Sequence, residues 1–298
     1  MTILRTVFYG LVFASTSVVL FGQQVSPTDS IHSNRSFYHT YGIGLGFSSF
    51  RDLATSPLFY DGFGLQLFTA WTKFSDHHDQ YIDFDLSFSP HKDRPPNSDF
   101  LQPSTGAFLG QFNLRVLELW KIKPFSSPKV NVKFGGAVLF TQNFRVNTAL
   151  QNAALGLESF AHIMAAGQVS VDVSRKKARS LKFLFIKREL PPVRRELRFL
   201  FQGGLLNLNQ RPGYAYVYHN EIDGTGTNPI EFLRGPYRLN VGGWRFSTEC
   251  TFITFRPAGN ALGISYLWDA SYAPGVLESF QMSSHRLRFS YHFKTKKK

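Results

Sequence analysis

The stretch FYHTYGIGLGFS, residues 37–48, decides the fold because its side chains alternate between two kinds. The odd positions carry the bulky residues Phe37, His39, Tyr41, Ile43, Leu45 and Phe47. After Tyr38, the even positions carry only Thr, Gly and Ser. Successive side chains of a β-strand point to opposite faces of the sheet. We therefore predict a strand with one bulky, aromatic face and one face of small residues.

The same period of two recurs along the chain and predicts ten strands. The other nine bulky rows lie in residues 62–71, 82–89, 108–116, 130–140, 168–173, 197–208, 237–252, 262–271 and 286–293. In two of these rows the bulky face changes phase at a glycine pair, Gly203-Gly204 and Gly242-Gly243. Such a one-residue change of phase at glycine is typical of a β-bulge, which bends barrel strands.

Sheets with this alternation occur in soluble β-sandwiches and in membrane barrels. The outer face of a sandwich meets water and favours Lys, Glu and Thr, whereas the second face here carries mainly Gly, Ser, Asn and Ala. Aromatic residues also lie at the expected strand ends, as in the girdles of membrane barrels: Tyr41, Trp71, Trp120, Tyr237, Trp268 and Phe293. We predict an all-β, antiparallel transmembrane β-barrel of about 10 strands, or 12 if residues 181–186 and 214–218 add two more.

Connection lengths predict how the barrel lies in its membrane. Short connections are expected at 75–80, 121–128 and 256–260, and long ones at 50–61, 90–105, 142–162 and 210–236. Short periplasmic turns and longer extracellular loops alternate in this way in outer-membrane barrels. The exception is residues 174–194, a long basic stretch on the short side. We also expect a short helix at Ala149–Ala161 in an outer loop.

The first residues predict export from the cytoplasm. Met1–Arg5 carries one positive charge, Val7–Phe21 is almost entirely apolar, and Gly22 provides a small residue for cleavage. This order describes a secretory signal peptide, and the apolar run is shorter than the ~20 residues of a membrane anchor. We expect a signal peptide at 1–22, an N-terminal periplasmic segment at 23–36, the barrel at 37–293 and a basic tail at 294–298.

Composition excludes several other classes of protein. The chain is 43% hydrophobic and 18% charged, which is too apolar for a disordered protein. Its single Cys250 excludes an internal disulfide framework and a four-Cys zinc module. By composition alone, the net charge of +13 suggests a protein that binds nucleic acid, but the predicted export of the chain argues against that partner. The excess of bases lies in Lys121–Lys129, Arg175–Arg195 and the tail, all on the predicted periplasmic side.

The last strand, LRFSYHF at Leu287–Phe293, is similar to the C-terminal strand that the barrel-assembly machinery recognises. From 37 to 293 the chain resembles the integral outer-membrane β-barrel proteins of Gram-negative bacteria. Its Phe-rich character and the lysine tail after Phe293 resemble barrels of the Bacteroidetes lineage. The resemblance implies an outer-membrane location, contact with outer-membrane lipid, and the assembly machinery as a partner during biogenesis. At the basic rim we expect either lipid phosphates or an acidic periplasmic or envelope protein.

The row of small residues is predicted to face the lumen together with isolated charged residues. These are Asp83, Asp85, Arg115, Lys133, Asp172, Glu196, Arg198, Arg238, Arg245, Glu249, Asp269, Arg286, Arg288 and His292. Buried charges persist in a narrow lumen only when they are paired, and a ten-stranded barrel is near the size that side chains fill. We therefore expect a charge network that largely plugs the barrel of a structural or interaction component of the envelope.

Two other functions stay open at this point: a narrow pore for small solutes, and a hydrolase acting on lipid or peptide. Asp83 and Asp85 resemble one carboxylate pair of omptin-type proteases, but we place them near the periplasmic end, away from the extracellular rim where such enzymes act. His39 and His162 have no evident Ser and acid beside them. The Asp76–Asp79 turn, with its two histidines, lacks further metal ligands. We expect no cofactor and no metal, and the sequence does not point to an enzyme.

Overall fold

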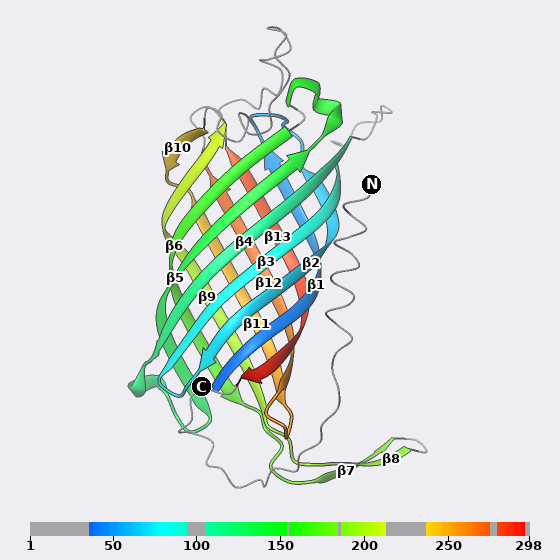
Figure 1. Cartoon of the computed structure of the whole chain (residues 1–298), viewed down its shortest axis with the longest axis vertical. Helices are drawn as coiled ribbons and strands as arrows, with labels where there is room; N and C mark the ends of the chain where they lie inside the picture. Colours follow the sequence, from blue (N-terminus) through cyan, green and yellow to red (C-terminus); the bar gives the residue numbers. More distant parts are fainter. Residues whose placement is uncertain are drawn as a thin grey trace.

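Ten long antiparallel strands close into a tilted barrel in the computed structural model (Figure 1). The structure describes residues 36–93, 105–153, 155–183, 186–212, 237–274 and 279–295. The barrel strands are β1 (Ser36–Asp52), β2 (Tyr60–Phe74), β3 (His78–Asp93), β4 (Gly106–Lys121), β5 (Val130–Val146), β6 (Leu155–Asp172), β9 (Arg195–Pro212), β11 (Trp244–Phe255), β12 (Ala261–Ala273) and β13 (Phe280–Thr295). The predicted signal peptide, the 214–218 strand and the last three lysines lie outside the described residues.

Each strand pairs with its neighbours in chain order, and two further pairings close the ring. β13 pairs with β1, and β6 pairs with β9. The short β10 (Tyr237–Val241) pairs with the far half of β9 and is separated from β11 only by Gly242-Gly243. The strand predicted at 237–252 is therefore β10 and β11 together. The prediction of an all-β antiparallel barrel of ten strands is confirmed. In the described part, no helix is long and apolar enough to cross a membrane.

The small residues face the lumen and the bulky residues face outward, as the alternation predicts. In β1, Thr40 and Ser48 are buried, whereas Ile43 is 60% exposed on the outer surface. Leu65 of β2 is 62% exposed on the same surface. Glycine is needed where inward side chains approach the wall, since a Cβ on Gly42 would lie 2.2 Å from the Phe68 ring.

As predicted, both glycine pairs mark irregularities: β9 continues through Gly203-Gly204 with a shift of register, and Gly242-Gly243 separates β10 from β11. Opposite Gly203-Gly204 the β6–β9 register shifts between Ile163 and Met164, and Leu205 is 73% exposed. Gly242 and Gly243 adopt positive φ angles of 124° and 85°. Only glycine adopts such angles without strain, and here they return the bulky row to the outer face.

Several strands extend beyond their predicted limits. β5 runs to Val146 and β6 begins at Leu155, so most of the loop predicted at 142–162 is strand. The helix predicted at Ala149–Ala161 is wrong. Its first part lies in a short 3-10 turn, η2 (Thr148–Ala153), and its second part pairs with β5. The cross-strand ladder satisfies the backbone here, and it brings Arg145 of β5 beside Glu158 of β6.

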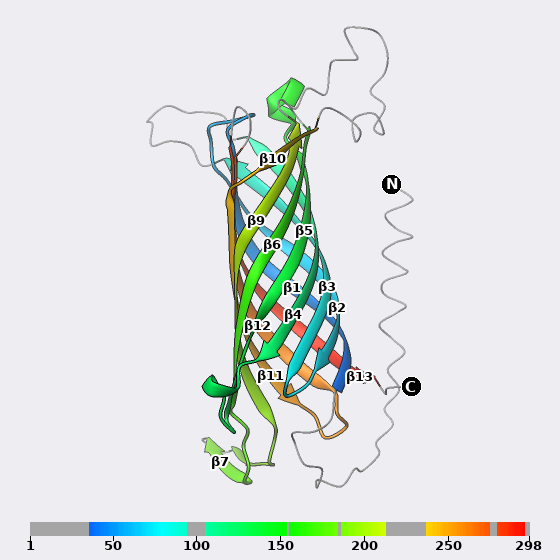
Figure 2. The same cartoon turned by 90° about the vertical axis from the view of Figure 1, so that its left-hand side faces the viewer.

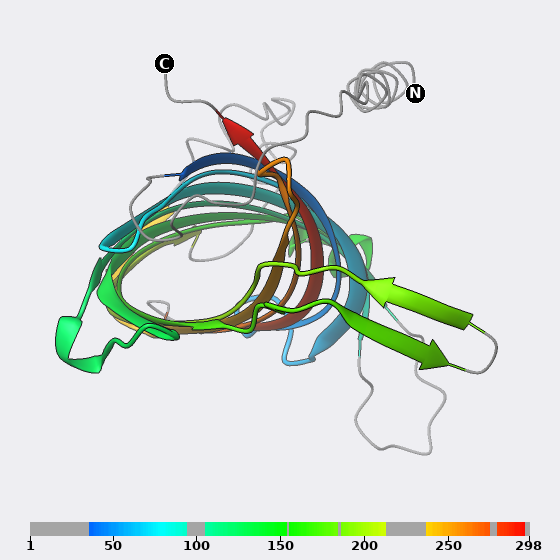
Figure 3. The ribbon, with the colours of Figure 1, turned by 90° about the horizontal axis from the view of Figure 1, so that it is seen from below.

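The long basic connection between β6 and β9 forms a separate hairpin, not an added barrel strand. The predicted strand 181–186 is divided between β7 (Arg179–Phe183) and β8 (Ile186–Leu190), which pair only with each other. The hairpin lies at the lower end in Figure 1, with the connections β2–β3, β4–β5 and β11–β12. Figure 2 shows the strand tilt, and Figure 3 shows the hairpin extending beyond the barrel wall. We call this end, which carries the predicted periplasmic turns, the short-turn end.

The substitution Gly243→Ala tests the bend at the Gly242-Gly243 pair. A Cβ at this position would lie 2.2 Å from the Tyr272 carbonyl oxygen, on a residue with φ +85°. We expect the free energy of unfolding from lipid vesicles to fall by about 2 kcal/mol or more, measured by urea titration. Gly203→Ala is the control because a Cβ there meets no atom within 4 Å. Equal losses of unfolding free energy in the two variants would contradict the conclusion that the bend at Gly243 requires glycine.

Candidate functional site

Charged side chains from distant strands meet across the middle of the lumen. Arg115 of β4 bonds Asp83 of β3 at 3.0 Å and lies 3.5 Å from Glu249 of β11. Its guanidinium also donates to the Gln202 side-chain oxygen of β9 at 3.1 Å. This group joins four strands, because the alternation aims all four side chains inward at one level.

A second group is built around Asp85 of β3. Its carboxylate lies 3.4 Å from the Arg288 guanidinium and 3.7 Å from that of Arg286, both on β13. The Asn113 amide donates to it at 2.9 Å. Asp85 and the two arginines are all buried, so this one carboxylate balances the positive charges of both Arg286 and Arg288 inside the barrel.

A hydrogen-bonded chain connects this second group to β11 and β12. Thr141 donates to Asn113 at 2.5 Å, and Arg245 donates to Thr141 at 2.7 Å. Arg245 also bonds Asp269 at 3.0 Å. The lumen charges are therefore paired either directly or through amide and hydroxyl groups, as buried charges require.

All but one of the remaining predicted lumen residues lie toward the short-turn end, and the exception is Arg238, in β10 at the opposite end. Lys133 bonds Asp79 at 2.7 Å, and Arg198 bonds Glu196 at 2.7 Å. The other three residues differ. His292 is buried and hydrogen-bonds Thr40 at 2.7 Å, Asp172 is exposed at the end of β6, and the side chain of Arg238 lies outside the described residues.

An ion-pair cluster that the sequence pattern did not predict lies at the opposite end. Arg145 of β5 lies between Asp52 of β1 and Glu158 of β6, and Arg211 of β9 bonds Asp52 at 2.5 Å. The Phe280 ring faces both guanidinium groups at 5.5 Å. These residues fall in or next to segments predicted as loops. Continuing the inward row of each strand by two or three alternations reaches Asp52, Arg145 and Arg211, and Glu158 lies five alternations before the predicted row at 168–173.

The other residues weighed in the sequence do not assemble a catalytic set. His39 faces outward, stacks on Trp71 at 5.0 Å between ring centroids and contacts Thr69. His162 is buried and hydrogen-bonds Asn207 at 2.6 Å. Asp83 and Asp85 lie midway along β3, not near the periplasmic end as expected, because β3 extends further toward both rims. Across the described residues, no group of three or more His, Cys, Asp or Glu side chains is placed to hold a metal ion.

Buried apolar side chains fill the space between the charged groups. Near the end that carries the Asp52 cluster they include Phe50, Tyr60, Phe160 and Phe280. Further along the lumen, a wall on β4, β5, β6 and β9 includes Leu117, Leu119, Leu139, Met164 and Leu200. At the short-turn end, Tyr38, Ile253 and Phe255 form a third cluster. The interior of the barrel is therefore packed with side chains at three levels.

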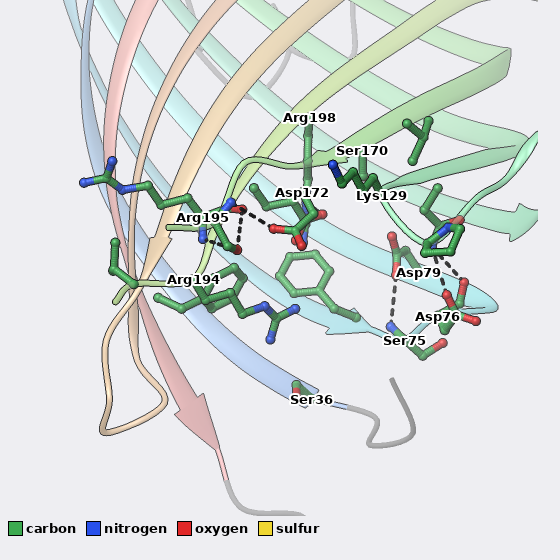
Figure 4. Close-up of a pocket in the computed structure, with 18 of the residues that line it drawn as sticks. Ser36, Ser75, Asp76, Asp79, Lys129, Ser170, Asp172, Arg194, Arg195 and Arg198 are labelled. Atoms are coloured by element: carbon green, nitrogen blue, oxygen red, sulfur yellow. Dashed lines mark hydrogen bonds and ion pairs between the residues drawn. The ribbon is translucent and has the colours of Figure 1, made fainter. Parts of the chain in front are cut away.

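One open cavity, of about 800 Å³, lies at the short-turn end, and we call it the vestibule (Figure 4). Its lining comes from β1, the β2–β3 and β4–β5 turns, and the segments on both sides of the β7–β8 hairpin. Seven basic residues line it against four acidic ones. The basic residues are Lys129, Lys133, Arg175, Lys176, Arg194, Arg195 and Arg198, and the acidic ones are Asp76, Asp79, Asp172 and Glu196.

The outer surface identifies the class of protein. Large apolar side chains cover the middle of the wall, and Tyr41, Trp71 and Trp120 lie at its short-turn edge, each about half exposed. A closed sheet with an apolar outer belt, an aromatic girdle and a polar interior is the structure that satisfies every backbone group in lipid. The chain has the architecture of an integral outer-membrane β-barrel protein.

Comparisons with known proteins find no family for the chain and give only distant structural similarities. No family model and no curated protein matches the chain. Among solved structures, the chain is similar to the attachment invasion locus protein Ail of Yersinia pestis, with 10% identity, a TM-score of 0.26, and 87% of this chain and 98% of that chain covered. It is also similar to the transport unit of the autotransporter AIDA-I from Escherichia coli, with 9% identity, a TM-score of 0.32, and 96% and 97% covered. The Bacteroidetes resemblance stays a prediction.

Replacing Asp85 by Asn tests whether the lumen network stabilises the barrel. The variant keeps the size of the side chain but leaves the buried Arg286 and Arg288 charges without a counter-ion. We expect the free energy of unfolding from lipid vesicles to fall by about 3 kcal/mol, followed by tryptophan fluorescence in urea. Asp172→Asn makes the same chemical change at the exposed end of β6 and should cost less than about 0.5 kcal/mol. A similar, small loss in both variants would show that the network contributes little.

Proposed function

We propose that this protein is an outer-membrane β-barrel with a charge-paired, largely plugged lumen that acts as a structural or interaction component of the cell envelope. The observation that carries the proposal is the packing of the interior. Ion pairs join opposite walls at mid-barrel, and buried aromatic side chains occupy the lumen on both sides of them. A solute path through this interior would require buried charges to separate, which costs several kcal/mol per pair.

We propose that the protein contacts its partner at the short-turn end, which we orient toward the periplasm. The vestibule opens there, and the β7–β8 hairpin extends sideways from the same end (Figure 3). The sequence of the connection from Arg175 to Arg195 is strongly basic. An acidic periplasmic or envelope protein is the partner that such a rim favours, while outer-membrane lipid surrounds the apolar belt.

The predicted signal peptide and the C-terminal strand support the outer-membrane location. Residues 1–22 have the charge and hydropathy order of an exported precursor, and β13 ends in the aromatic strand that the assembly machinery recognises in similar barrels. We propose that the chain is exported, cleaved near Gln23 and inserted by that machinery.

A narrow pore for small solutes is the second candidate, and the vestibule favours it because it already opens one end of the lumen. The third function weighed, hydrolysis of lipid or peptide, has no observation in its favour. Within the described part of the chain, neither His39 nor His162 hydrogen-bonds a carboxylate, and the contacts that they do make are the ones expected of interfacial and packed histidines.

Planar-bilayer recording separates the plugged barrel from the pore. We expect the purified barrel to give no steady single-channel current, because side chains fill its cross-section. The variant Phe50→Ala/Phe280→Ala removes two fully buried rings from the lumen and should produce intermittent small currents. The variant Phe47→Ala/Phe289→Ala, on the outer face of the paired strands β1 and β13, should stay silent. Steady conductance of the unchanged protein would reject the plugged barrel in favour of the pore.

A further inference from the structure

The inner part of the vestibule is balanced in charge. Lys133 is bonded to Asp79, and its ammonium also donates to the Ser75 carbonyl at 2.6 Å. Arg198 is bonded to Glu196 and also donates to the Tyr81 hydroxyl at 3.3 Å. These inner cations already have partners, so they are not available to a ligand in the vestibule.

The mouth of the vestibule, in contrast, has an excess of positive charge. Lys129, Lys176 and Arg194 line it, and within the described residues none of the three forms an ion pair with a carboxylate. Two carboxylates line the rim with them: Asp76, which is bonded to Lys121 at 2.9 Å, and Asp172, which accepts the Ser174 backbone N–H at 2.9 Å. Three exposed cations therefore share a rim with two carboxylates that already have partners.

The three cations come from separate segments that the fold brings to one opening. Lys129 lies in the β4–β5 turn, Lys176 precedes the β7–β8 hairpin, and Arg194 follows it. Figure 4 shows Lys129 and Arg194 at different sides of the vestibule, and shows the Arg195 side chain extending away from Arg194. Arg195 lies over Phe252 on the outer face at 5.8 Å, so it does not contribute its charge to the mouth.

Aromatic side chains hold the position of the Arg194 guanidinium. It lies 4.2 Å from the centre of the Phe255 ring, which is part of a cluster with Tyr38 at 6.5 Å between centroids. A guanidinium stacked on a ring keeps its N–H groups, at its edge, free to donate in the ring plane. The wall is therefore pre-organised for an anionic acceptor, and less side-chain entropy is lost when one binds.

From this arrangement we propose that the vestibule is a binding site for a phosphate-bearing ligand that enters from the short-turn side. A phosphate group carries up to two charges on several acceptor oxygens, so it matches an opening that is lined by cations from separate segments. A single carboxylate is planar and carries one charge, so it matches such a rim less well. The cavity volume of about 800 Å³ is that of a small-molecule site, and it admits the organic part of the ligand beside Tyr38 and Phe74.

The chemistry of a phosphate group is the same on a soluble molecule and on a lipid headgroup, so the test has two arms. The folded barrel in zwitterionic detergent is titrated with inorganic pyrophosphate in one arm and with short-chain phosphatidylglycerol in the other, by isothermal calorimetry at low salt. We expect saturable binding in at least one arm, weakening as salt is added. Pyrophosphate binding identifies a soluble ligand, and binding of the lipid alone identifies a headgroup.

The variant Lys129→Gln/Lys176→Gln/Arg194→Gln should weaken that binding at least about tenfold, because several charge-assisted bonds are lost. Lys123→Gln/Lys177→Gln/Arg256→Gln is the matched control. It removes three exposed cations from the same end, none of which lines the vestibule, and should change affinity less than about twofold. Heat-modifiable migration on unboiled gels checks that both variants fold. Absence of binding in both arms, or equal binding by the two variants, overturns the proposal.

The proposal depends on the barrel and its vestibule, and not on whether the lumen conducts. Titration measures binding at the mouth of the vestibule, whereas bilayer recording measures whether the packed interior conducts ions. If the barrel conducts and binds pyrophosphate, the plugged lumen is rejected and the phosphate site is retained. If the barrel is silent and binds neither probe, the phosphate site is rejected and the plugged lumen is retained.

Discussion

The structure depends on one constraint, the closure of a single hydrogen-bonded sheet. β13 pairs with β1 from Phe37–Thr295 to Asp52–Phe280, so the strands form a ring with no free edge along the membrane-spanning wall. Once the ring is closed, each strand has an inner and an outer face, and the alternation of side chains becomes a separation between lumen and lipid. Small residues line the inside because the ring is narrow, and apolar side chains cover the outside because lipid accepts them.

Closure also determines the chemistry of the lumen. Side chains from walls far apart in sequence are brought within bonding distance, so that Arg115 meets Glu249 and Asp85 meets Arg288. In a dry interior these charges persist only as pairs, and pairing holds opposite walls together. Toward the short-turn end the lumen widens into the vestibule, where water reaches the rim and exposed cations need no buried partner. The contrast between a balanced interior and a basic mouth follows from this difference in hydration.

Much of the barrel was predictable from local pattern. The period of two located all ten strands, and the phase changes located the bends at Gly203-Gly204 and Gly242-Gly243, since a bulge leaves a trace in the sequence. The strand ends were not predictable in the same way. Residues such as Asp52, Arg145 and Glu158 look like loop residues by composition, and they are strand residues because the cross-strand hydrogen bonds extend to them, which places Arg145 beside both acids. For the same reason, the Ala149–Ala161 segment looked helical and is partly strand.

By itself, the sequence determined which residues face inward, which face lipid, and that the lumen charges nearly balance, because side-chain alternation is a local property of each strand. Only the tertiary structure decided which charges pair, that the basic stretch 174–194 folds out as a hairpin, and that Lys129, Lys176 and Arg194 share one opening. Those facts depend on strand register, on ring closure and on the course of the chain between the strands, which bring together residues that are distant in the sequence. The sequence alone assigns the net charge of +13 to one end of the barrel, and the fold gathers part of it around a cavity.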